Sequence, residues 1–370
     1  MTVEREVAII GTRGIPAAHG GFETFAERLA LYLKDRGWKV VVYCQGSESR
    51  SVEVDSWNGV TRVHIPVRSS GALSTIEFDW RCISHLLRTR PGVVLTLGYN
   101  TAVFCARLKL RGVRNVINMD GIEWKRAKWG RIAKLWFRIN EWAGAWLGDH
   151  LVADHPGIAE HLNARHGVGH KISMIPYGAD DVSVRDFDEL ERLGVEPHRF
   201  YSVIARPEPE NSILEIVEGF AMAPRKHKLL VLGSYDGSND YHRAVLRAAN
   251  EDVIFAGAIY DKRMLAEIRA GSFAYVHGHT VGGTNPSLVE ALGAGSPVLA
   301  HDNEFNRWVA GAAAVYFDSA EAAGQAFTRL EVGDALPAEL GLLAKQFHSK
   351  RFRWVDILGE YESLLLAKLA

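Results

Sequence analysis

Two glycine-rich stretches contain the residue types that could bind an anionic ligand. The first runs from Gly11 to Gly21 and the second from His277 to Glu290. In the second stretch, Gly282-Gly283 are followed by Thr284-Asn285, which can cap a helix, and by a proline suited to the first helical turn. Backbone amides at a helix start suit phosphate groups, so this stretch predicts a diphosphate site. Glu290, about one turn further into the helix, could accept hydrogen bonds from ribose hydroxyls.

Motifs for several other chemistries are absent from the sequence. The first glycine-rich stretch lacks the G-x-G-x-x-G pattern, and the second expected strand ends at Tyr43-Cys44-Gln45 without an acid for an adenosine ribose, which disfavours NAD. No P-loop Gly-Lys pair, G-x-S-x-G elbow or H-E-x-x-H motif occurs. The three cysteines, Cys44, Cys82 and Cys105, form neither a disulfide framework nor a zinc pattern.

The elements that must position these stretches alternate between strand and helix. Short apolar runs predict strands over residues 7–10, 40–43, 93–97, 115–118 and 150–153 in the first half, and over 200–205, 228–232, 253–256, 273–276 and 297–300 in the second half. Two successive α/β series in 370 residues predict two doubly wound parallel-sheet domains, residues 1–180 and 198–347, joined by a linker over residues 177–198. Ligands of such folds usually bind at the carboxyl ends of the strands, in the cleft between the domains.

The chain resembles the retaining glycosyltransferases of family 4 over nearly its whole length. Four strings carry the resemblance: 11–16, 20–25, 118–126 and 282–290. They are similar to a bacterial branch that includes rhamnosyltransferases of capsule and cell-wall polysaccharide synthesis. The resemblance implies the α/β GT-B fold, in which two Rossmann-like domains face a cleft. It also implies that the first domain binds the acceptor, that the second binds a nucleotide-sugar, and that the last helix, about residues 350–370, crosses back onto the first domain.

The activity implied by the resemblance is metal-independent sugar transfer with retention, without any other cofactor. The most plausible donor is dTDP-rhamnose, and the acceptor is a saccharide linked to polyprenyl diphosphate. Three alternatives stay open: a transferase using a UDP- or GDP-hexose, a non-catalytic module that binds a nucleotide-sugar or glycan, and a metal-dependent GT-A transferase. The last would need an Asp-x-Asp at a strand end, whereas Asp186-Phe187-Asp188 falls in the expected linker.

The resemblance and the residue types together give a set of candidate site residues. The expected donor-binding residues are Arg206, Asn211, His279, Gly282, Gly283, Thr284, Asn285, Ser287 and Glu290. The expected acceptor-binding residues are Arg13, His19, Gly20, Gly21, Glu23, Glu123, Trp124 and Lys125. Relatives commonly carry a glutamate at the position of Gly282 and a lysine at that of Asn211, so the chain departs from the family there. Glu23 could instead be an acid that matches the helix dipole.

Asp120 is the candidate catalytic residue. It follows an expected strand near the place where relatives carry a histidine beside the donor sugar. A carboxylate there could bind a sugar hydroxyl or stabilise an oxocarbenium-like transition state. The alternative is that Asp120 only caps a turn.

Five of the ten tryptophans lie between Trp124 and Trp146, with basic residues among them. Helical spacing places Trp129, Ile132, Trp136, Ile139, Ala143 and Trp146 on one face, and directs Arg131, Lys134, Arg138 and Glu141 away from it. Two interpretations stand side by side: a basic amphipathic helix on an anionic membrane surface, or an ordinary helix whose apolar face joins the core.

Charge and hydropathy bound the partners and the location. Lys plus Arg is 43 against 44 Asp plus Glu, which disfavours nucleic acid as a partner. No apolar stretch reaches the ~18 residues of a membrane span, and the first residues lack the features of a signal peptide. We therefore expect a cytoplasmic protein, peripheral on the inner face of the cell membrane.

Overall fold

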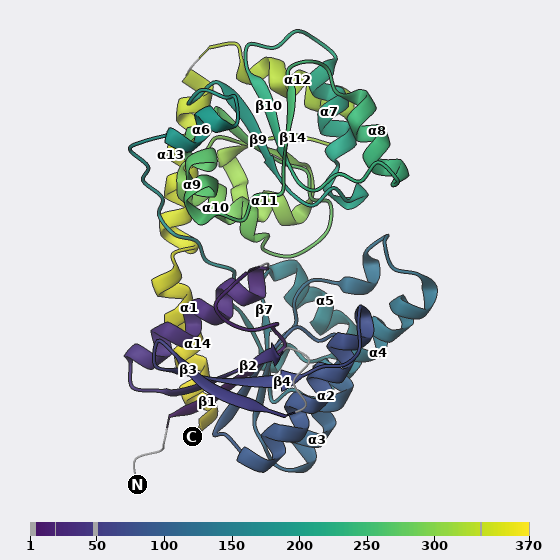
Figure 1. The fold of residues 1–370 in the computed structure, drawn as a ribbon, viewed down its shortest axis with the longest axis vertical. Helices are drawn as coiled ribbons and strands as arrows, with labels where there is room; N and C mark the ends of the chain where they lie inside the picture. Colours follow the sequence, from purple (N-terminus) through teal and green to yellow (C-terminus); the bar gives the residue numbers. More distant parts are fainter. Residues whose placement is uncertain (1–4, 19, 47–50, 334, 370) are drawn as a thin grey trace. The chain divides into compact units, whose positions relative to one another are not determined.

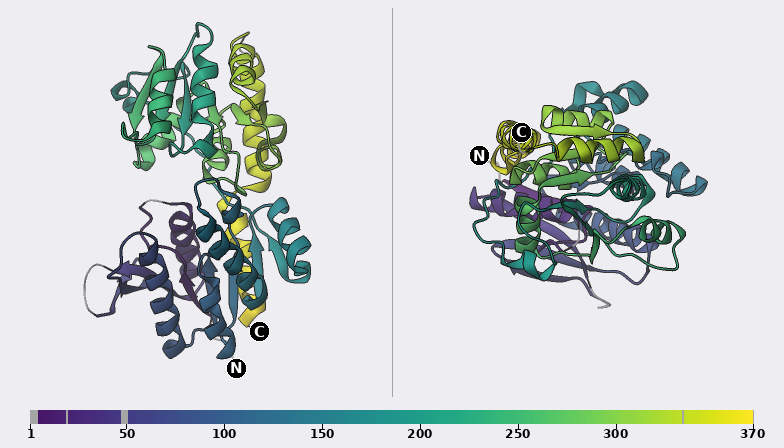
Figure 2. Two further views of the ribbon diagram at one scale, coloured as in Figure 1. Left: turned by 90° about the vertical axis from the view of Figure 1, so that its right-hand side faces the viewer. Right: turned by 90° about the horizontal axis from the view of Figure 1, so that it is seen from above.

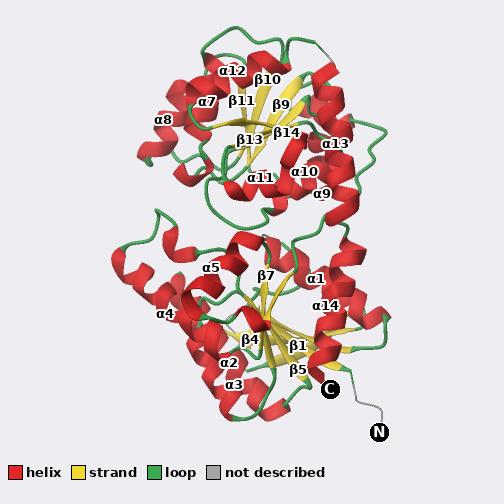
Figure 3. Ribbon diagram, turned by 180° about the vertical axis from the view of Figure 1, so that it is seen from behind, coloured by secondary structure: helices red, strands yellow, loops and turns green. Residues whose placement is uncertain are grey.

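The computed structural model describes residues 5–18, 20–46, 51–333 and 335–369. The chain forms two compact units (Figure 1), and helices lie on both faces of each central sheet (Figure 3). Unit 1 comprises residues 1–176 and 355–370, and unit 2 comprises residues 177–354. Within the described ranges, no helix combines the length and the apolar character needed to cross a membrane.

Unit 1 is built on an eight-stranded sheet with the order β3-β4-β2-β1-β5-β6-β7-β8. All neighbouring strands are parallel except β3 and β4, which form an antiparallel pair. The central strands β1 and β5 are almost wholly buried, because helices cover both faces of the sheet. The strands are β1 (Glu6–Ile10), β2 (Lys39–Gly46), β3 (Glu53–Trp57), β4 (Val60–Pro66), β5 (Val93–Leu97), β6 (Asn115–Asn118), β7 (His150–Ala153) and β8 (Ile172–Met174).

The helices of unit 1 include one from the far end of the chain. They are α1 (Gly21–Asp35), α2 (Ala72–Thr89), α3 (Ala106–Leu110), α4 (Arg131–Leu147), α5 (Pro156–His166) and α14 (Trp354–Leu369), with short 3-10 turns at Ala102–Cys105, Glu123–Lys125 and Gly169–Lys171. The Tyr361 ring of α14 lies 4.6 Å from the Phe25 ring of α1, and its hydroxyl accepts a hydrogen bond from Asn118 Nδ2 at 2.9 Å. Figure 2 shows α14 running through unit 1.

Unit 2 is built on a six-stranded, fully parallel sheet with the order β11-β10-β9-β12-β13-β14. Its strands are β9 (Phe200–Ile204), β10 (Lys228–Leu232), β11 (Val253–Gly257), β12 (Ala274–His277), β13 (Val298–His301) and β14 (Ala314–Phe317). Its helices are α6 (Asp188–Arg192), α7 (Ile213–Ala221), α8 (Asp240–Ala248), α9 (Lys262–Gly271), α10 (Pro286–Ala294), α11 (Glu304–Ala310), α12 (Ala320–Leu330) and α13 (Ala335–Arg351), with 3-10 turns at Pro209–Asn211 and Gly311–Ala313. One core cluster includes Phe220 and Phe327, and another includes Leu288 and Phe352.

Unit 2 begins at residue 177, within the range 177–198 that the sequence predicts to be a linker. The difference arises because Leu190 of α6 and Val195, just after this helix, are buried in a cluster with Phe200 and Ile268. The Asp186-Phe187-Asp188 triplet leads into α6 and does not end a strand, which removes the geometry that a GT-A transferase would need.

Both sheets have one point at which the strand order reverses. In unit 1 this switch point lies between β1 and β5, and in unit 2 it lies between β9 and β12. Loops that leave neighbouring strands at such a point run in opposite directions and leave a crevice between them. The two doubly wound parallel sheets confirm the expected α/β class.

Candidate functional site

The switch point of unit 2 brings together the loop after β9 and the loop after β12. Thr280 donates to the Glu210 carbonyl oxygen from both its backbone nitrogen (2.9 Å) and its hydroxyl (3.0 Å). At Gly278, an added Cβ would lie 2.0 Å from the Asn211 carbonyl oxygen. Only glycine permits this approach, so the sequence holds the two loops in direct contact.

The second loop leads into α10, and the start of this helix is fixed by hydrogen bonds to the sheet. Asn285 is the N-cap, and its Oδ1 accepts from the Ser287 nitrogen at 3.1 Å, as the sequence predicted. The Ser287 hydroxyl accepts from the Tyr275 hydroxyl of β12 at 2.8 Å and donates to the Ile204 carbonyl of β9 at 3.3 Å. The first turn of α10 is therefore rigid, and its dipole favours a negatively charged group at this point.

Glu290 forms an ion pair that sequence reasoning missed. Its Oε2 accepts from Arg269 Nη2, and Arg269 is a buried residue of α9. A buried guanidinium needs a charged partner, so this contact fixes the orientation of the Glu290 carboxylate. The carboxylate remains partly exposed, which leaves it accessible to a ligand. No local sequence signal links two residues on different helices.

The remaining predicted donor-binding residues differ in how accessible their side chains are to a ligand. Arg206 is exposed directly after β9, whereas the Asn211 side chain is buried and donates to the Arg206 carbonyl at 2.7 Å. Asn211 therefore organises the loop from within. Gly282 has φ +134° and open space around its Cβ position, so a glutamate here would require a backbone conformation that L residues rarely adopt. Gly283 is half-buried beside it, and Thr284 is buried.

The His279 ring stacks on His277 with the ring centres 4.4 Å apart. His277 is buried at the end of β12, and its Nδ1 lies 3.2 Å from the Tyr275 hydroxyl. Burial, followed by the nearby His279 and His301, holds the pKa of His277 well below its usual range. His277 is therefore a neutral support for the loop.

In unit 1, Asp120 follows β6 in a left-handed backbone conformation with φ +52°. Its backbone nitrogen donates to Asn118 Oδ1 at 2.9 Å, and the Asn118 amide in turn donates to Tyr361 of α14. Burial raises the pKa of the Asp120 carboxyl, and the Arg126 charge opposes that shift. Non-glycine residues in this conformation concentrate at functional sites, where surrounding contacts hold them in place.

Three acceptor candidates, Glu123, Trp124 and Lys125, follow Asp120 and differ in their exposure to solvent. Glu123 is buried: its Oε1 lies 2.7 Å from Arg126 Nε, and its Oε2 accepts from Trp129 Nε1 at 3.2 Å. Burial and the neighbouring Asp120 charge raise the pKa of Glu123. Trp124 is half-buried and donates from Nε1 to Glu141, whereas Lys125 is exposed.

Glu141 is the centre of a buried polar cluster, and its prediction as an outward residue was wrong. The side chain is 1% exposed. It accepts from Trp124 Nε1 at 2.7 Å and lies 3.1 Å from His161, Arg165 and His166 of α5. Burial alone would raise its pKa, but hydrogen bonds from His161, Trp124 and His166 lower the pKa of Glu141 to about 2. Glu141 thus joins the loop after β6 to α4 and α5.

The predicted division of α4 into faces was right for Ile132, Ile139 and Trp146, which share one face, and wrong for Ala143, which is buried with Glu141. The buried face contains Phe137, Asn140, Glu141, Ala143 and Gly144. The exposed face is a stripe at alternating spacings of three and four residues, which we call the α4 stripe: Ile132 (88% exposed), Leu135, Ile139, Trp142 and Trp146. Polar residues were assigned to the solvent because spacing alone does not reveal the partners that bury them.

The loop after β1 is held by two glutamates of α1. Glu23 Oε2 accepts from the Ala18 nitrogen at 3.0 Å, and Glu27 Oε2 accepts from the Ala17 nitrogen at 2.6 Å. Gly20 caps and Gly21 begins α1, and Arg13 is exposed on the loop. His19 lies outside the described residues.

A family model described as a domain of unknown function, DUF1972, matches residues 4–180. No curated protein matches the chain by sequence.

Solved structures match the chain over almost its whole length. Sucrose-phosphate synthase from Thermosynechococcus elongatus has a TM-score of 0.78 at 17% identity, covering 97% of this chain and 98% of that one. HepE of Anabaena in complex with UDP-glucose has a TM-score of 0.76 at 14% identity, covering 98% and 99%. WaaG, a glycosyltransferase involved in lipopolysaccharide biosynthesis, has a TM-score of 0.76 at 15% identity, covering 97% and 99%. These similarities confirm the GT-B fold.

Proposed function

We propose that this chain is a glycosyltransferase that moves a sugar from a nucleotide diphosphate, bound by unit 2, onto a saccharide acceptor, bound by unit 1. The observation that carries the proposal is the switch point of unit 2, where the hydrogen-bonded start of α10 is followed, one turn on, by the Glu290 carboxylate. This arrangement offers a positive helix end for phosphates and a carboxylate for ribose hydroxyls. HepE, whose fold is similar, was solved with UDP-glucose.

In the proposed donor complex, the exposed Arg206 and the backbone amides of Thr284 and Asn285, just before Pro286, bind the diphosphate. Glu290 accepts hydrogen bonds from the ribose, and Arg269 acts as the residue that positions it. The bond between the anomeric carbon and the diphosphate oxygen breaks, a bond from that carbon to the acceptor hydroxyl oxygen forms on the same face, and the leaving diphosphate takes the acceptor proton. Asp120 binds a hydroxyl of the transferred sugar or stabilises its developing positive charge. We assign no protein nucleophile, and we propose a retaining reaction without a metal.

The proposed donor is dTDP-rhamnose and the proposed acceptor is a saccharide on polyprenyl diphosphate, both from the resemblance of the glycine-rich strings to the rhamnosyltransferase branch. The α4 stripe supports a membrane-bound acceptor. Its exposed apolar residues lie on a helix that also carries Arg131, Lys134 and Arg138, which complement anionic headgroups. In this proposal the protein rests on the inner face of the cell membrane.

The alternative, a module that binds a nucleotide-sugar without transferring it, has one observation in its favour. The Asn211 amide is occupied inside the loop and Gly282 supplies no side chain, so two positions that are charged in relatives contribute no charge here. Normal donor affinity without transfer to any lipid-linked acceptor would favour this alternative.

Calorimetric titration with dTDP, UDP, GDP and their sugars, in the presence of EDTA, tests the donor site. We expect one nucleotide to bind, and the Glu290→Gln variant to bind it about tenfold more weakly, since a hydrogen bond to a charged group contributes about 1.5–3 kcal/mol. The matched control is Glu321→Gln, which removes the same charge from an exposed position on α12. Unchanged affinity in Glu290→Gln would remove Glu290 from the site, and no binding by the unmodified chain would contradict the proposal.

A further inference from the structure

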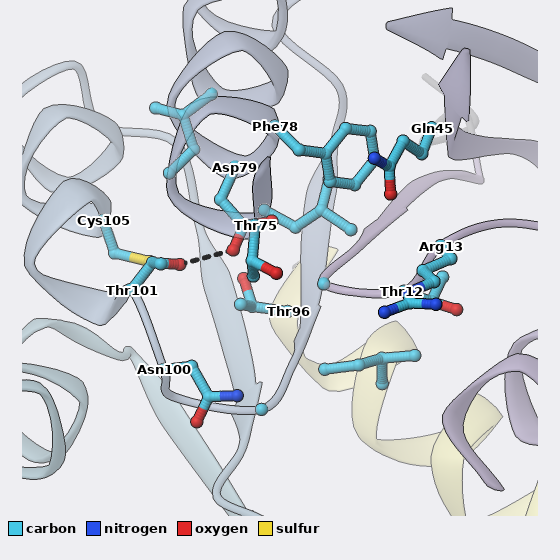
Figure 4. A pocket seen from close by; sticks show the side chains of 15 residues that line it. Thr12, Arg13, Gln45, Thr75, Phe78, Asp79, Thr96, Asn100, Thr101 and Cys105 are labelled. Atoms are coloured by element: carbon cyan, nitrogen blue, oxygen red, sulfur yellow. Dashed lines mark hydrogen bonds between the residues drawn. The ribbon is translucent and has the colours of Figure 1, made fainter. Parts of the chain in front are cut away.

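Unit 1 contains a pocket of about 180 Å³ at its own switch point, and apart from Arg13 none of its lining residues has been assigned a role above. The pocket lies between the carboxyl ends of β1 and β5, with α2 forming one wall (Figure 4). At Gly11, an added Cβ would lie 2.2 Å from the Leu97 carbonyl oxygen, so the two strand ends approach as closely as glycine allows. The fold therefore places a crevice here in the position where doubly wound sheets bind ligands.

A buried carboxylate points into this pocket. Asp79 of α2 is 7% exposed, and its Oδ2 accepts from the Thr101 hydroxyl at 2.7 Å. Among the residues that the structure describes, no cation pairs with Asp79. Burial raises the pKa of Asp79 to about 6, and the Thr101 hydrogen bond opposes the shift only in part. A buried acid with a single neutral partner costs stability, which favours a role in binding over a role in holding the fold.

Arg13, which is exposed on the loop after β1, is the cationic residue of the lining, and apart from Asp79 the remaining lining groups carry no charge. Thr12, Gln45, Thr75 and Asn100 contribute hydroxyls and amides, and Figure 4 shows them arranged around the same space as the Phe78 ring. A ligand with several hydroxyl donors and an apolar face would match one carboxylate, several neutral hydrogen-bonding groups and an aromatic surface. A phosphate or carboxylate ligand would instead be repelled by Asp79.

The size of the pocket agrees with a single sugar ring. Roughly 10–15 Å³ of cavity volume is needed to hold one water-sized group, so the pocket holds on the order of a dozen such groups. A hexose has a similar number of non-hydrogen atoms.

We propose that this pocket binds one sugar unit of the acceptor, with Asp79 accepting hydrogen bonds from its hydroxyls. That the ligand is part of the acceptor rests on the proposed function. That the ligand is rich in hydroxyl groups rests on the residues that line the pocket.

Saturation-transfer NMR with the full chain tests the pocket, using D-glucose, L-rhamnose and N-acetyl-D-glucosamine as probes at millimolar concentration. We expect at least one sugar to receive saturation, and the Asp79→Asn variant to bind it about tenfold more weakly. A second variant, Thr75→Trp, fills the mouth of the pocket from an exposed position and leaves the buried acid intact. The matched control is Glu77→Gln on the same helix, whose carboxylate lies outside the pocket and accepts from Ser69.

Equal saturation in both pocket variants and the control would overturn the proposal, as would the absence of transfer to all three sugars in the unmodified chain. Calorimetric titration of the same variants with the donor nucleotide separates this result from failure of the proposed function. If the unmodified chain binds the nucleotide and the pocket variants bind sugar as tightly as it does, only the proposed role of the pocket is rejected. If the unmodified chain binds no nucleotide, the proposed transferase function is rejected.

Discussion

Replacing Glu141 with glutamine should destabilise unit 1 in a pH-dependent way. The carboxylate is buried and receives hydrogen bonds from one tryptophan and from side chains of α5. Because the folded pKa is depressed, the ionised form stabilises the fold at any pH above the unfolded value. That stabilisation is lost as the pH falls from 4.5, the unperturbed value, through about 2, the value in the fold.

The magnitude follows from the size of the shift. A fall from 4.5 to about 2 corresponds to about 3 kcal/mol at neutral pH, at 1.36 kcal/mol per pKa unit. At pH 3.5 the carboxylate is already partly protonated in the unfolded chain, and the same relation gives about 2 kcal/mol. The loss in Glu141→Gln should therefore shrink by roughly a third between these two pH values.

Tryptophan fluorescence during guanidinium unfolding measures this loss, because most of the ten tryptophans lie in unit 1. Glu160→Gln is the matched control: it removes a carboxylate from an exposed position on α5 and should change stability by less than about 0.5 kcal/mol. Equal destabilisation by the two variants would refute the reasoning, as would a loss in Glu141→Gln that stays constant between pH 7 and pH 3.5.

Two further predictions concern unit 1. Asp79→Asn should stabilise the fold, because the pKa of the Asp79 carboxyl is raised from about 3.9 in the unfolded chain to about 6 in the fold, so its ionisation costs up to about 3 kcal/mol of stability above pH 6. The gain in the free energy of unfolding, measured with denaturant, should nearly vanish at pH 4. A gain of the same size at pH 4 and pH 7.5 would contradict the assignment. Trp142→Glu on the α4 stripe should reduce sedimentation of the protein with vesicles containing anionic phospholipid at least several-fold. The control Leu342→Glu, at an exposed apolar position on α13, should leave this sedimentation unchanged. Equal binding by the two variants would leave the α4 stripe without a membrane role.

Features with local causes were predictable from the sequence. The start of α10 was predicted from Asn285 and Pro286, because a cap and a first-turn proline act on backbone groups within one turn. Strands β1, β2, β5 to β7 and β9 to β13 were predicted from apolar runs, because helices cover both faces and leave no alternation of polar residues. The edge strands β8 and β14 were not predicted. The antiparallel hairpin of β3 and β4 was not predicted, although Asn58-Gly59 between the strands is a strong hairpin signal, and both residues have positive φ.

Features that depend on distant segments escaped prediction. Glu141 was assigned to the solvent because its partners lie on the next helix, and the spacing of α4 contains no trace of them. Arg269 was missed for the same reason, since its pairing with Glu290 requires α9 and α10 to pack together. The Asp79 pocket combines residues from β1, β2, α2 and β5, so it exists only once the strand order is known.

The place of α14 in unit 1 has a consequence for synthesis on the ribosome. Tyr361 and Glu362 cover Phe25, Trp38 and Asn118, yet they are translated after the whole of unit 2. Between Pro176 and Val355 the ribosome adds the 178 residues of unit 2, which takes about 10–35 s at roughly 5–20 residues per second. Throughout this interval the part of unit 1 that contacts α14, including Phe25 and Trp38, lacks its covering helix. In this chain the first unit to emerge is therefore the last to complete its folding.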